Sequence, residues 1–399
     1  MMNNRLIALL LVAILPLSLL AKKKPEVKGY EFKMIYDLPT TPVKDQYRTG
    51  TCWSFSGMAY FETELIRMGK GEFDLAEMYA VRQAYIEKAD RYVRYQGKTN
   101  FGNGGIIHDV LYTIKKYGIV PESAYPGLKY EEPKHVHAEM DALLSSYVNT
   151  VIQNNNKKLS PVWHKGFEGI LDAYLGEVPS EFEVDSQKYT PRTYADQLEL
   201  NPDDYVVIGS YTHHPYYEPF IIEIPDNWLR GNIYNVPLEE MMEVVNNAIE
   251  NGFSVGWGAD VSEKGFSWKN GVAIVPDEDM PELDNLEQAK WEALGEKEKQ
   301  KLLYKFESPI KEKVITQEIR QKQFDNYLTT DDHGMVLTGI AEDQNGNTFY
   351  KVKNSWSESG NEYKGYFFAS KPFVALKTID VWVHKDALSK EIKDKLRIK

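Results

Sequence analysis

Residues 44–57 read KDQYRTGTCWSFSG and contain Cys52, the single cysteine of the 399-residue chain. Gln46 precedes this cysteine by six residues, and apolar residues follow it at helical spacing: Met58, Phe61, Leu65 and Met68. Gly69 then suits a left-handed helix end. The pattern predicts a thiol in the first turn of a helix, where unpaired N–H groups and the helix dipole favour a thiolate. A lone cysteine is also a common buried structural residue, so only other motifs in the chain can distinguish a catalytic cysteine from a structural one.

The composition is that of a folded, acidic protein. Hydrophobic residues make up 42% of the chain and aromatic residues 13%, which argues against disorder. The 47 basic residues are outnumbered by 59 acidic residues, giving a net charge of −12. Such a chain repels a phosphate backbone, so nucleic acid is not an expected ligand. Nothing in the sequence indicates a cofactor, and the oligomeric state, a homo-oligomer included, stays open.

The first 21 residues have the pattern of a secretory signal peptide. Arg5 precedes an apolar run from Leu6 to Leu20, and Ala21 offers a small residue at the cleavage site. The run contains Pro16 and is shorter than the ~20 residues of a membrane span, so we expect no stable membrane insertion after signal removal. An uncleaved anchor is the alternative. We therefore predict an exported protein, periplasmic or secreted, in which Cys52 has no partner for an intrachain disulfide.

The organisation along the chain predicts an α+β fold. Helices are expected over 107–118, entered through Gly104 and Gly105, and over 237–251. The C-terminal third alternates strands with turns: FSVGWGAD (253–260), GMVLTGIAED (334–343), TFYKVKNSW (348–356), GYFFAS (365–370) and IDVWV (379–383). A helical half followed by an antiparallel β half places the cleft between the two halves.

Four segments follow from this organisation. They are a signal peptide (1–21), a helical half with the nucleophile (22–130), an insertion and connecting segment (131–236), and a β-rich half (237–399). The insertion is expected to consist largely of exposed loops, including the run Asn154–Lys158. A charged amphipathic helix is expected over 286–307. The pair His213–His214 stands next to a proline and lacks the spacing of a zinc site, so no metal is predicted.

Hydrolysis of an amide by a thiol needs a nucleophile, an imidazole, a group that orients the imidazole, and donors for the oxyanion. Cys52 is the candidate nucleophile, and Gln46 can serve as an oxyanion donor together with the Cys52 N–H. His333, at the start of one strand, and Asn354, on the next, are the candidate imidazole and orienting group. Trp356 is placed to shield their hydrogen bond from water.

Local pairing does not bring this histidine and this asparagine together. A simple hairpin centred on Asn345–Gly346 pairs Asn354 with Leu337 and not with His333. A bulge or an off-centre turn is therefore needed to complete the triad.

These segments resemble the papain-like cysteine peptidases. TPVKDQYRTGTCWSFS (41–56) is similar to their nucleophile segment, with matching glutamine-to-cysteine spacing. FGNGG (101–105) is similar to the glycine segment that binds substrate backbone, and HGMVLTG (333–339) and KNSW (353–356) resemble the histidine and asparagine segments. The resemblance implies a papain-like fold with large insertions, in which peptides are the substrates.

The resemblance also implies a role for each matching residue. Cys52 would be the nucleophile, His333 the base and acid, Asn354 the orienting residue and Gln46 the oxyanion donor. The implied substrate-binding residues are Gly104, Gly105 and Trp356. With a lowered thiol pKa, Cys52 would be reactive at neutral pH.

Two departures point to one branch of the family. Thr49 stands where the secreted papain type has a disulfide cysteine, and 281 residues separate Cys52 from His333, against about 130–150 in papain-like enzymes. Both features resemble the bleomycin hydrolase and aminopeptidase C branch, which is normally intracellular. The segments 232–266 and 320–335 are similar to that branch too.

The branch implies a cysteine aminopeptidase. Its C-terminus enters the cleft and favours removal of N-terminal residues, whereas here the residues after IDVWV are highly charged and end at Lys399, short of the cleft. We therefore expect a cleft that is open on that side, with endopeptidase activity beside the aminopeptidase activity. The alternatives are a catalytically silent peptide-binding relative and a thiol amidase that acts on non-peptide amides.

Overall fold

The computed structural model describes residues 29–278 and 290–399 of the chain. One mixed sheet dominates these residues, with strand order β5-β6-β4-β13-β7-β10-β11-β12-β9-β8 and β1 beside β10. Its strands are β1 (Lys33–Asp37), β4 (Tyr205–Gly209), β5 (Pro219–Ile221), β6 (Asn232–Asn235), β7 (Val255–Ala259), β8 (Phe266–Ser267), β9 (Val272–Ala273), β10 (His333–Glu342), β11 (Thr348–Lys353), β12 (Tyr366–Ser370) and β13 (Thr378–His384). A separate hairpin is formed by β2 (Phe182–Val184) and β3 (Gln187–Tyr189).

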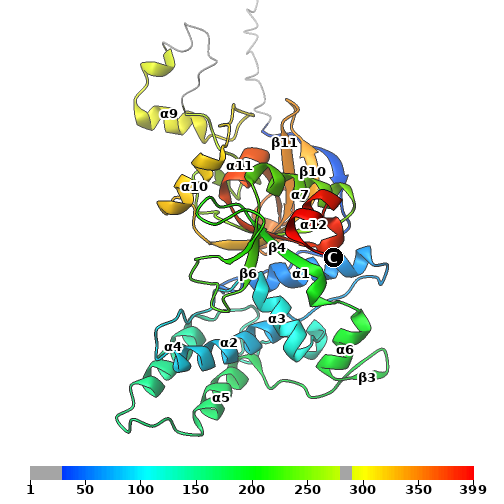
Figure 1. Ribbon diagram of the computed structural model, residues 1–399, viewed down its shortest axis with the longest axis vertical. Coiled ribbons are helices and arrows are strands. Elements are labelled where there is room, and N and C mark those ends of the chain that lie inside the picture. Colours follow the sequence, from blue (N-terminus) through cyan, green and yellow to red (C-terminus); the bar gives the residue numbers. More distant parts are fainter. Residues whose placement is uncertain (1–28, 279–289) are drawn as a thin grey trace, which may run out of the picture.

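Helices cover both faces of the sheet. Those of the first half gather at one end of the molecule (Figure 1): α1 (Cys52–Arg67), α2 (Glu77–Arg94), α3 (Ile107–Tyr117), α4 (Ala138–Ile152), α5 (Trp163–Leu175) and α6 (Pro191–Leu198). The later helices lie on the sheet side: α7 (Leu238–Glu250), α9 (Glu296–Leu303), α10 (Gln317–Asp325), α11 (Lys371–Lys377) and α12 (Lys390–Leu396). The predicted α+β architecture is confirmed.

The alternation of strand side chains builds two cores. Along β10, Val336 faces the core shared with the first helices, whereas Met335 and Leu337 face the core shared with α7, α11 and α12. Successive side chains of a strand point to opposite faces, so both faces of β10 are apolar because both are covered. The start of β10 is thereby held between α1 and the later helices.

Helix α1 begins at Cys52, as predicted, and ends at Arg67, two residues before Gly69 with its φ of +74°. It is buried along most of its length and contacts both α3 and β10. The contact with α3 is close enough that a Cβ at Gly57 would lie 2.6 Å from the Val110 side chain. The thiol therefore sits on a rigid element at the junction of the helical half and the sheet.

The predicted irregularity between β10 and β11 is confirmed. Near the turn, Glu342 pairs with Thr348, and the register shifts between Leu337 and Gly339, so that Leu337 then faces Val352. The bulge at this shift moves the end of β11 toward the start of β10. The continued register places Asn354 opposite Met335, two residues from His333, and the Asn354 side chain spans this offset so that its Oδ1 lies 2.7 Å from His333 Nε2.

Other predictions from the sequence were wrong or incomplete. The segment 131–236 was expected to be largely loop, but it forms α4, α5 and α6 and supplies β4–β6 to the main sheet. The run Asn154–Lys158 does form a loop, between α4 and α5. Of the helix expected over 286–307, the regular part of α9 begins only after Gly295, and residues 286–289 lie outside the described residues.

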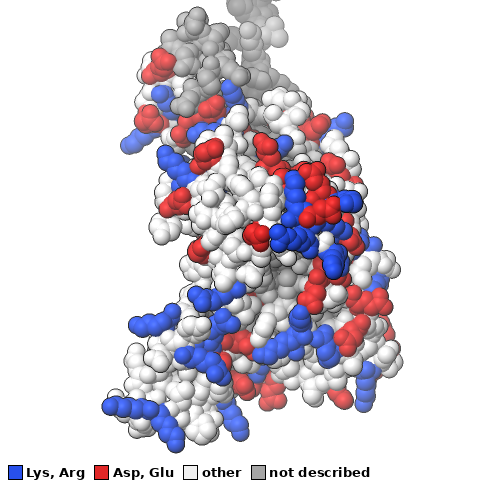
Figure 2. Space-filling view, in the orientation of Figure 1, with Lys and Arg blue, Asp and Glu red and all other residues white. Residues whose placement is uncertain are grey.

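The C-terminal residues pack on the sheet side of the molecule. Ile392 and Leu396 of α12 are buried in the second core, and Lys395 Nζ lies 3.0 Å from a carboxylate oxygen of Glu240 on α7. Figure 2 shows acidic and basic side chains mixed in this region. The tail is an amphipathic helix docked beside α7.

Trp382 of β13 connects the sheet to α1. Its fully buried ring lies 4.8 Å from the Tyr60 ring and 5.5 Å from the Phe61 ring, and it covers Gly256 on β7. The Trp382→Ala variant is expected to lower the free energy of unfolding by about 3–5 kcal/mol, because it leaves a cavity between α1 and the sheet. Urea unfolding followed by circular dichroism measures this loss.

The matched control is Tyr327→Ala, since the Tyr327 side chain is 84% exposed. Its free energy of unfolding is expected to stay within about 0.5 kcal/mol of the parent. Equal unfolding midpoints for the Trp382 and Tyr327 variants would contradict the proposed anchoring of α1.

Candidate active site

One cavity brings together residues from distant parts of the chain. Cys52 reaches it from the start of α1, and His333 reaches it from the start of β10. A backbone N–H of Gly334 bonds to the thiol, which places Cys52 directly beside the histidine segment. The other lining residues are Trp53, Ser56, Gly105, Ile106, Ile107, Asp226, Gly258, Asp331, Asp332 and Asp380.

The imidazole of His333 is held by Asn354. Its Nε2 lies 2.7 Å from Asn354 Oδ1, and both side chains are buried, at 5% and 3% exposure. The backbone N–H of Ser355 also donates to Asn354 Oδ1, at 2.8 Å, so this atom acts as an acceptor. Nε2 of His333 must therefore carry the proton, and Nδ1 is left as the basic nitrogen.

Trp356 covers this hydrogen bond, as the sequence predicted. Its ring lies 4.9 Å from the His333 ring at an interplanar angle of 32°. Trp356 also packs against Phe266 and Trp268. This position suits the predicted shielding of the histidine from water. Trp356 does not line the cavity of Cys52, and its substrate-binding role stays a prediction.

Gln46 is anchored next to the same loop. Its Oε1 accepts a 2.6 Å hydrogen bond from Ser355 Oγ, and its Nε2 donates to the Thr49 carbonyl at 2.8 Å. One hydrogen of the carboxamide nitrogen remains for a further acceptor. The oxyanion role predicted for Gln46 is compatible with this orientation and stays a prediction.

Burial works against the predicted lowering of the thiol pKa, and the reactivity of Cys52 at neutral pH stays a prediction. Burial raises the pKa of the Cys52 thiol to about 12, and the charges of Asp331 and Asp226 add to the increase. The N–H groups of Gly334 and Trp53 oppose it without reversing it. Burial also lowers the pKa of His333 to about 4, although the hydrogen bond that its Nε2 donates to Asn354 Oδ1 acts in the opposite direction. A thiolate here requires transfer of the thiol proton to His333 or neutralisation of the nearby carboxylates.

Of the glycine pair, Gly105 lines the cavity of Cys52 and Gly104 directly precedes it. Gly105 faces the cavity, and a Cβ there would lie 2.3 Å from Asp109 Oδ2 and 3.0 Å from the Trp53 ring. The Gly104 carbonyl accepts a hydrogen bond from Lys88, and Trp53 Nε1 donates to the Asn103 carbonyl at 3.0 Å. The segment is thus fixed close to Cys52, and side chains at Gly104 and Gly105 would not fit.

Reasoning from the sequence missed the carboxylates of the cavity. They are Asp226, Asp331, Asp332 and Asp380. Asp331 and Asp332 directly precede His333, which was the available signal. Asp226 and Asp380 come from segments that only the tertiary fold brings to the site.

Two features outside the cavity also emerge. His213 and His214 both contact the Glu223 carboxylate, through Nε2 at 3.2 and 2.8 Å, and the three groups form a compact cluster of potential ligands. Gln321 Nε2 donates to His213 Nδ1, so the proton of His213 lies on Nε2, toward Glu223. In this structure, hydrogen bonds connect the two histidines to Glu223 and connect His213 to Gln321.

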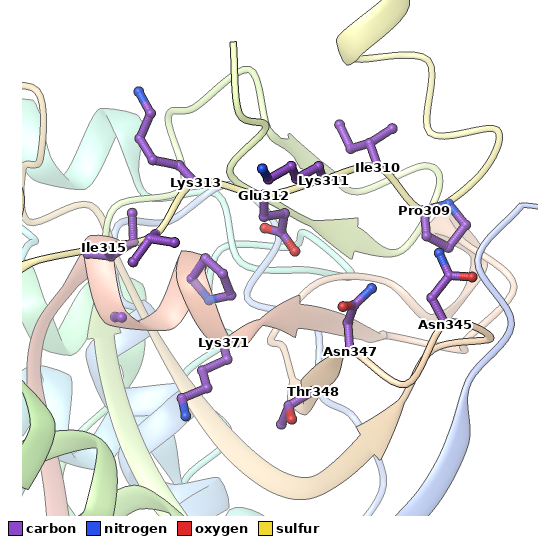
Figure 3. Close-up of a pocket in the computed structure, with 13 residues that line it drawn as sticks. Pro309, Ile310, Lys311, Glu312, Lys313, Ile315, Asn345, Asn347, Thr348 and Lys371 are labelled. Atoms are coloured by element: carbon purple, nitrogen blue, oxygen red, sulfur yellow. The ribbon is translucent and has the colours of Figure 1, made fainter. Parts of the chain in front are cut away.

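A second cavity lies where the segment 309–315 passes over the β10–β11 turn and α11 (Figure 3). Glu312 points into the structure there and accepts bonds from the Val275 N–H and Ser370 Oγ. None of the candidate catalytic residues lines this cavity.

The fold is that of a papain-like cysteine peptidase. The family model described as "Papain family cysteine protease" matches residues 34–174, and the model described as "Peptidase C1-like family" matches residues 179–399, more than half of the chain. The chain belongs to the Peptidase C1-like family.

Similar proteins agree with this assignment. Aminopeptidase C of Lactococcus lactis subsp. lactis is 23% identical over 399 residues, covering 89% of this chain and 83% of the relative. Aminopeptidase C of Listeria innocua is 25% identical, with coverages of 90% and 83%. The crystal structure of pepw from Lactobacillus rhamnosis HN001 has a TM-score of 0.68 at 22% identity, covering 92% of this chain and 84% of that chain.

Alkylation by iodoacetamide tests the electrostatics of the thiol. Because its pKa is raised, the alkylation rate of Cys52 is expected to increase about tenfold per pH unit from pH 6 to pH 10, without the plateau that a free cysteine reaches above pH ~8.5. Asp331→Asn removes a nearby charge and is expected to shift the profile to lower pH. Mass spectrometry of the modified protein measures the rates.

Asp203→Asn serves as the control, since this exposed carboxylate pairs with Lys115 on the surface. It is expected to leave the profile unchanged. A rate that is already maximal below pH 7 would show that His333 keeps the thiol ionised, and would contradict the raised pKa.

Proposed function

We propose that the protein is a cysteine aminopeptidase that removes residues from the free N-terminus of peptides. The observation that carries the proposal is the 2.7 Å hydrogen bond between His333 and Asn354 beside Cys52, in one cavity. The names of the relatives, Aminopeptidase C, support the direction of cleavage.

In the acylation step, Cys52 acts as the nucleophile, His333 transfers the proton, and Gln46 helps to bind the oxyanion. Cys52 Sγ attacks the carbonyl carbon of the scissile bond while its proton moves to Nδ1 of His333. The oxyanion that forms accepts hydrogen bonds from the Cys52 N–H and from the free hydrogen of Gln46 Nε2. Collapse of this intermediate breaks the C–N bond, and protonated His333 gives its proton to the leaving amine.

Deacylation reverses the proton transfer. His333 takes a proton from water, and the hydroxide attacks the thioester carbonyl carbon. Expulsion of the Cys52 thiolate, which regains the proton from His333, releases the free amino acid. Asn354 keeps the imidazole in the same tautomer through both steps, because its Oδ1 accepts from Nε2.

The position of α12 indicates whether the cleft excludes peptides that lack a free N-terminus. Its buried residues Ile392 and Leu396 pack beside α7, and none of residues 390–399 lines the cavity of Cys52. We infer that α12 does not close the cleft, so that slow cleavage of N-blocked peptides accompanies the aminopeptidase activity.

Two other functions are the alternatives: a catalytically silent peptide-binding protein and a thiol amidase that acts on non-peptide amides. A silent peptide-binding relative has no need of an oriented imidazole, whereas all four catalytic positions are filled here: Gln46, Cys52, His333 and Asn354. A thiol amidase shares the chemistry and differs only in the substrate, so a panel of peptide and non-peptide amides separates it from a peptidase.

Substitutions at the catalytic positions test the proposed roles. With an aminoacyl fluorogenic amide under reducing conditions, Cys52→Ala is expected to abolish turnover. His333→Ala is expected to lower kcat by about 10²–10⁴-fold through loss of general base catalysis. Gln46→Ala is expected to lower kcat by about 10²–10³-fold with a smaller change in KM. Steady-state kinetics on purified variants measure these effects.

His164→Ala is the matched control for the histidine substitution, because His164 lies on the exposed side of α5. It is expected to retain full activity. If the Cys52→Ala variant turns over the substrate as fast as the parent, the proposed nucleophile is wrong.

We further propose that the protein is exported and loses residues 1–21. The support is the basic and apolar pattern of that segment, together with a single cysteine that needs no disulfide partner. Among the residues that the structure describes, none of the helices has the length and apolar character that a membrane crossing requires. Fractionation of cells expressing the full chain is expected to recover a mature form that begins after Ala21.

The control replaces Leu10 and Leu11 with arginine, which disrupts the apolar run and is expected to keep the protein in the cytoplasm. Recovery of the parent protein from the cytoplasm with Met1–Ala21 intact would contradict the export proposal.

A further inference from the structure

The cavity beside Cys52 is unusually acidic for a site that must form a thiolate. Four aspartates line it, from three separate parts of the chain: Asp226, Asp331, Asp332 and Asp380. Neither lysine nor arginine occurs among the described residues that line it. Like charges in a confined space repel one another. The buried ammonium group of Lys88 offsets part of this repulsion at Asp226, whereas Asp331 and Asp380 lack such a partner and favour the protonated form.

Glycines make room for two of these carboxylates. Gly258 of β7 pairs with Gly334 on one side and with Asp380 on the other, so Asp380 stands one strand away from the histidine segment. A Cβ at Gly258 would lie 2.8 Å from Asp380 Oδ1. A Cβ at Gly104 would lie 2.1 Å from Asp226 Oδ2. Both carboxylates thus fill space that an ordinary side chain would occupy.

The carboxylates differ in how well the protein satisfies them. Asp332 accepts bonds from Thr330 Oγ1 at 2.9 Å and from the Ser262 N–H at 3.2 Å, so it belongs to the surface loop. Asp331 Oδ2, in contrast, is buried without a hydrogen-bond partner. Asp380 is only 3% exposed and accepts one backbone bond, from Gly258. Buried carboxylate oxygens without donors are costly, and they lie where a substrate binds.

We propose that Asp331 and Asp380, with Asp226 on the facing wall, form a subsite for the ammonium group of the substrate. This inference rests on the proposed peptidase function and specifies its substrate class, peptides with a free, charged N-terminus. An ammonium group offers three donors, which suits several carboxylates at once. In a substrate cleaved after its first residue, the α-nitrogen is one carbon away from the carbonyl that Cys52 attacks.

The electrostatics of the site agree with this role. Burial, together with repulsion by Asp226 and Asp380, holds the pKa of Asp331 well above its usual range. Burial likewise raises the pKa of Asp380 to about 7. A bound ammonium group would stabilise both carboxylates and offset the charges of Asp331 and Asp226 that disfavour the Cys52 thiolate. A charged N-terminus would therefore assist the formation of the nucleophile.

Three fluorogenic amides test the subsite: the leucyl amide, its N-acetyl derivative, and the 4-methylpentanoyl amide, which lacks the amino group. The parent is expected to hydrolyse the leucyl amide with a kcat/KM about 100-fold higher than that of either amide without a charged amino group. Two hydrogen bonds between charged groups contribute a free energy of this order. Asp331→Asn and Asp380→Asn are each expected to reduce this preference about tenfold, mainly through an increase in KM for the leucyl amide.

Two further substrates identify the source of the ammonium group. N-acetyl-arginyl and N-acetyl-lysyl-leucyl amides carry a cationic side chain and no charged N-terminus. If they match the leucyl amide, and lose that rate in Asp331→Asn, the subsite serves a side chain and the assignment to the α-ammonium group is overturned. Asp203→Asn is the charge-matched control and is expected to leave every preference unchanged.

A binding measurement keeps the inference separate from the proposed function. The Cys52→Ser protein is expected to bind leucinamide more tightly than N-acetyl-leucinamide by calorimetry, and Asp331→Asn in that background is expected to remove the difference. Equal binding of the two amides overturns the subsite even if the peptidase is active. Absence of hydrolysis with a retained difference in binding overturns the peptidase function and leaves the subsite in place. If Asp380→Asn does not fold, Asp331→Asn decides, since its free Oδ2 supports no contact within the protein.

Discussion

The hydrogen bond between His333 Nε2 and Asn354 Oδ1 is the interaction on which the site depends. It sets the tautomer of the imidazole and thereby leaves Nδ1 as the nitrogen that can exchange a proton with Cys52. The register shift between Leu337 and Gly339 moves the end of β11 one residue closer to the start of β10, and the Asn354 side chain spans the remaining offset. Two apolar faces hold β10 in place, so His333 stands at the start of a strand that is packed on both sides.

The same burial that orders the histidine works against the nucleophile. Burial in an acidic cavity raises the pKa of Cys52, while the start of α1 and the Gly334 N–H supply the opposing contribution. In the proposed subsite, an ammonium group bound beside Cys52 would offset the nearby negative charges, so that substrate recognition would assist the formation of the thiolate.

The catalytic motifs could be predicted because each is local. The helix that begins at Cys52 and the strands around His333 and Asn354 follow from short-range periodicity and turns, and the need for a bulge follows from simple register arithmetic. The helices within 131–236 were missed although α4 has Met140, Leu144 and Val148 at helical spacing. The acidic wall was missed because β7, β13 and the loop of Asp226 meet only in the folded chain, and burial, which sets the pKa values, has no signature in sequence.

The central claim is that Cys52 carries the acyl group during turnover, with His333 as the base and acid and Asn354 as the residue that orients the imidazole. Intact-protein mass spectrometry after rapid mixing with a leucine p-nitrophenyl ester and acid quench measures this directly. The account predicts that the mass increases by one leucyl group, that peptide mapping places the group on Cys52 as a thioester, and that Cys52→Ala shows no adduct. Turnover without any adduct on Cys52, or an adduct on another residue, would contradict it.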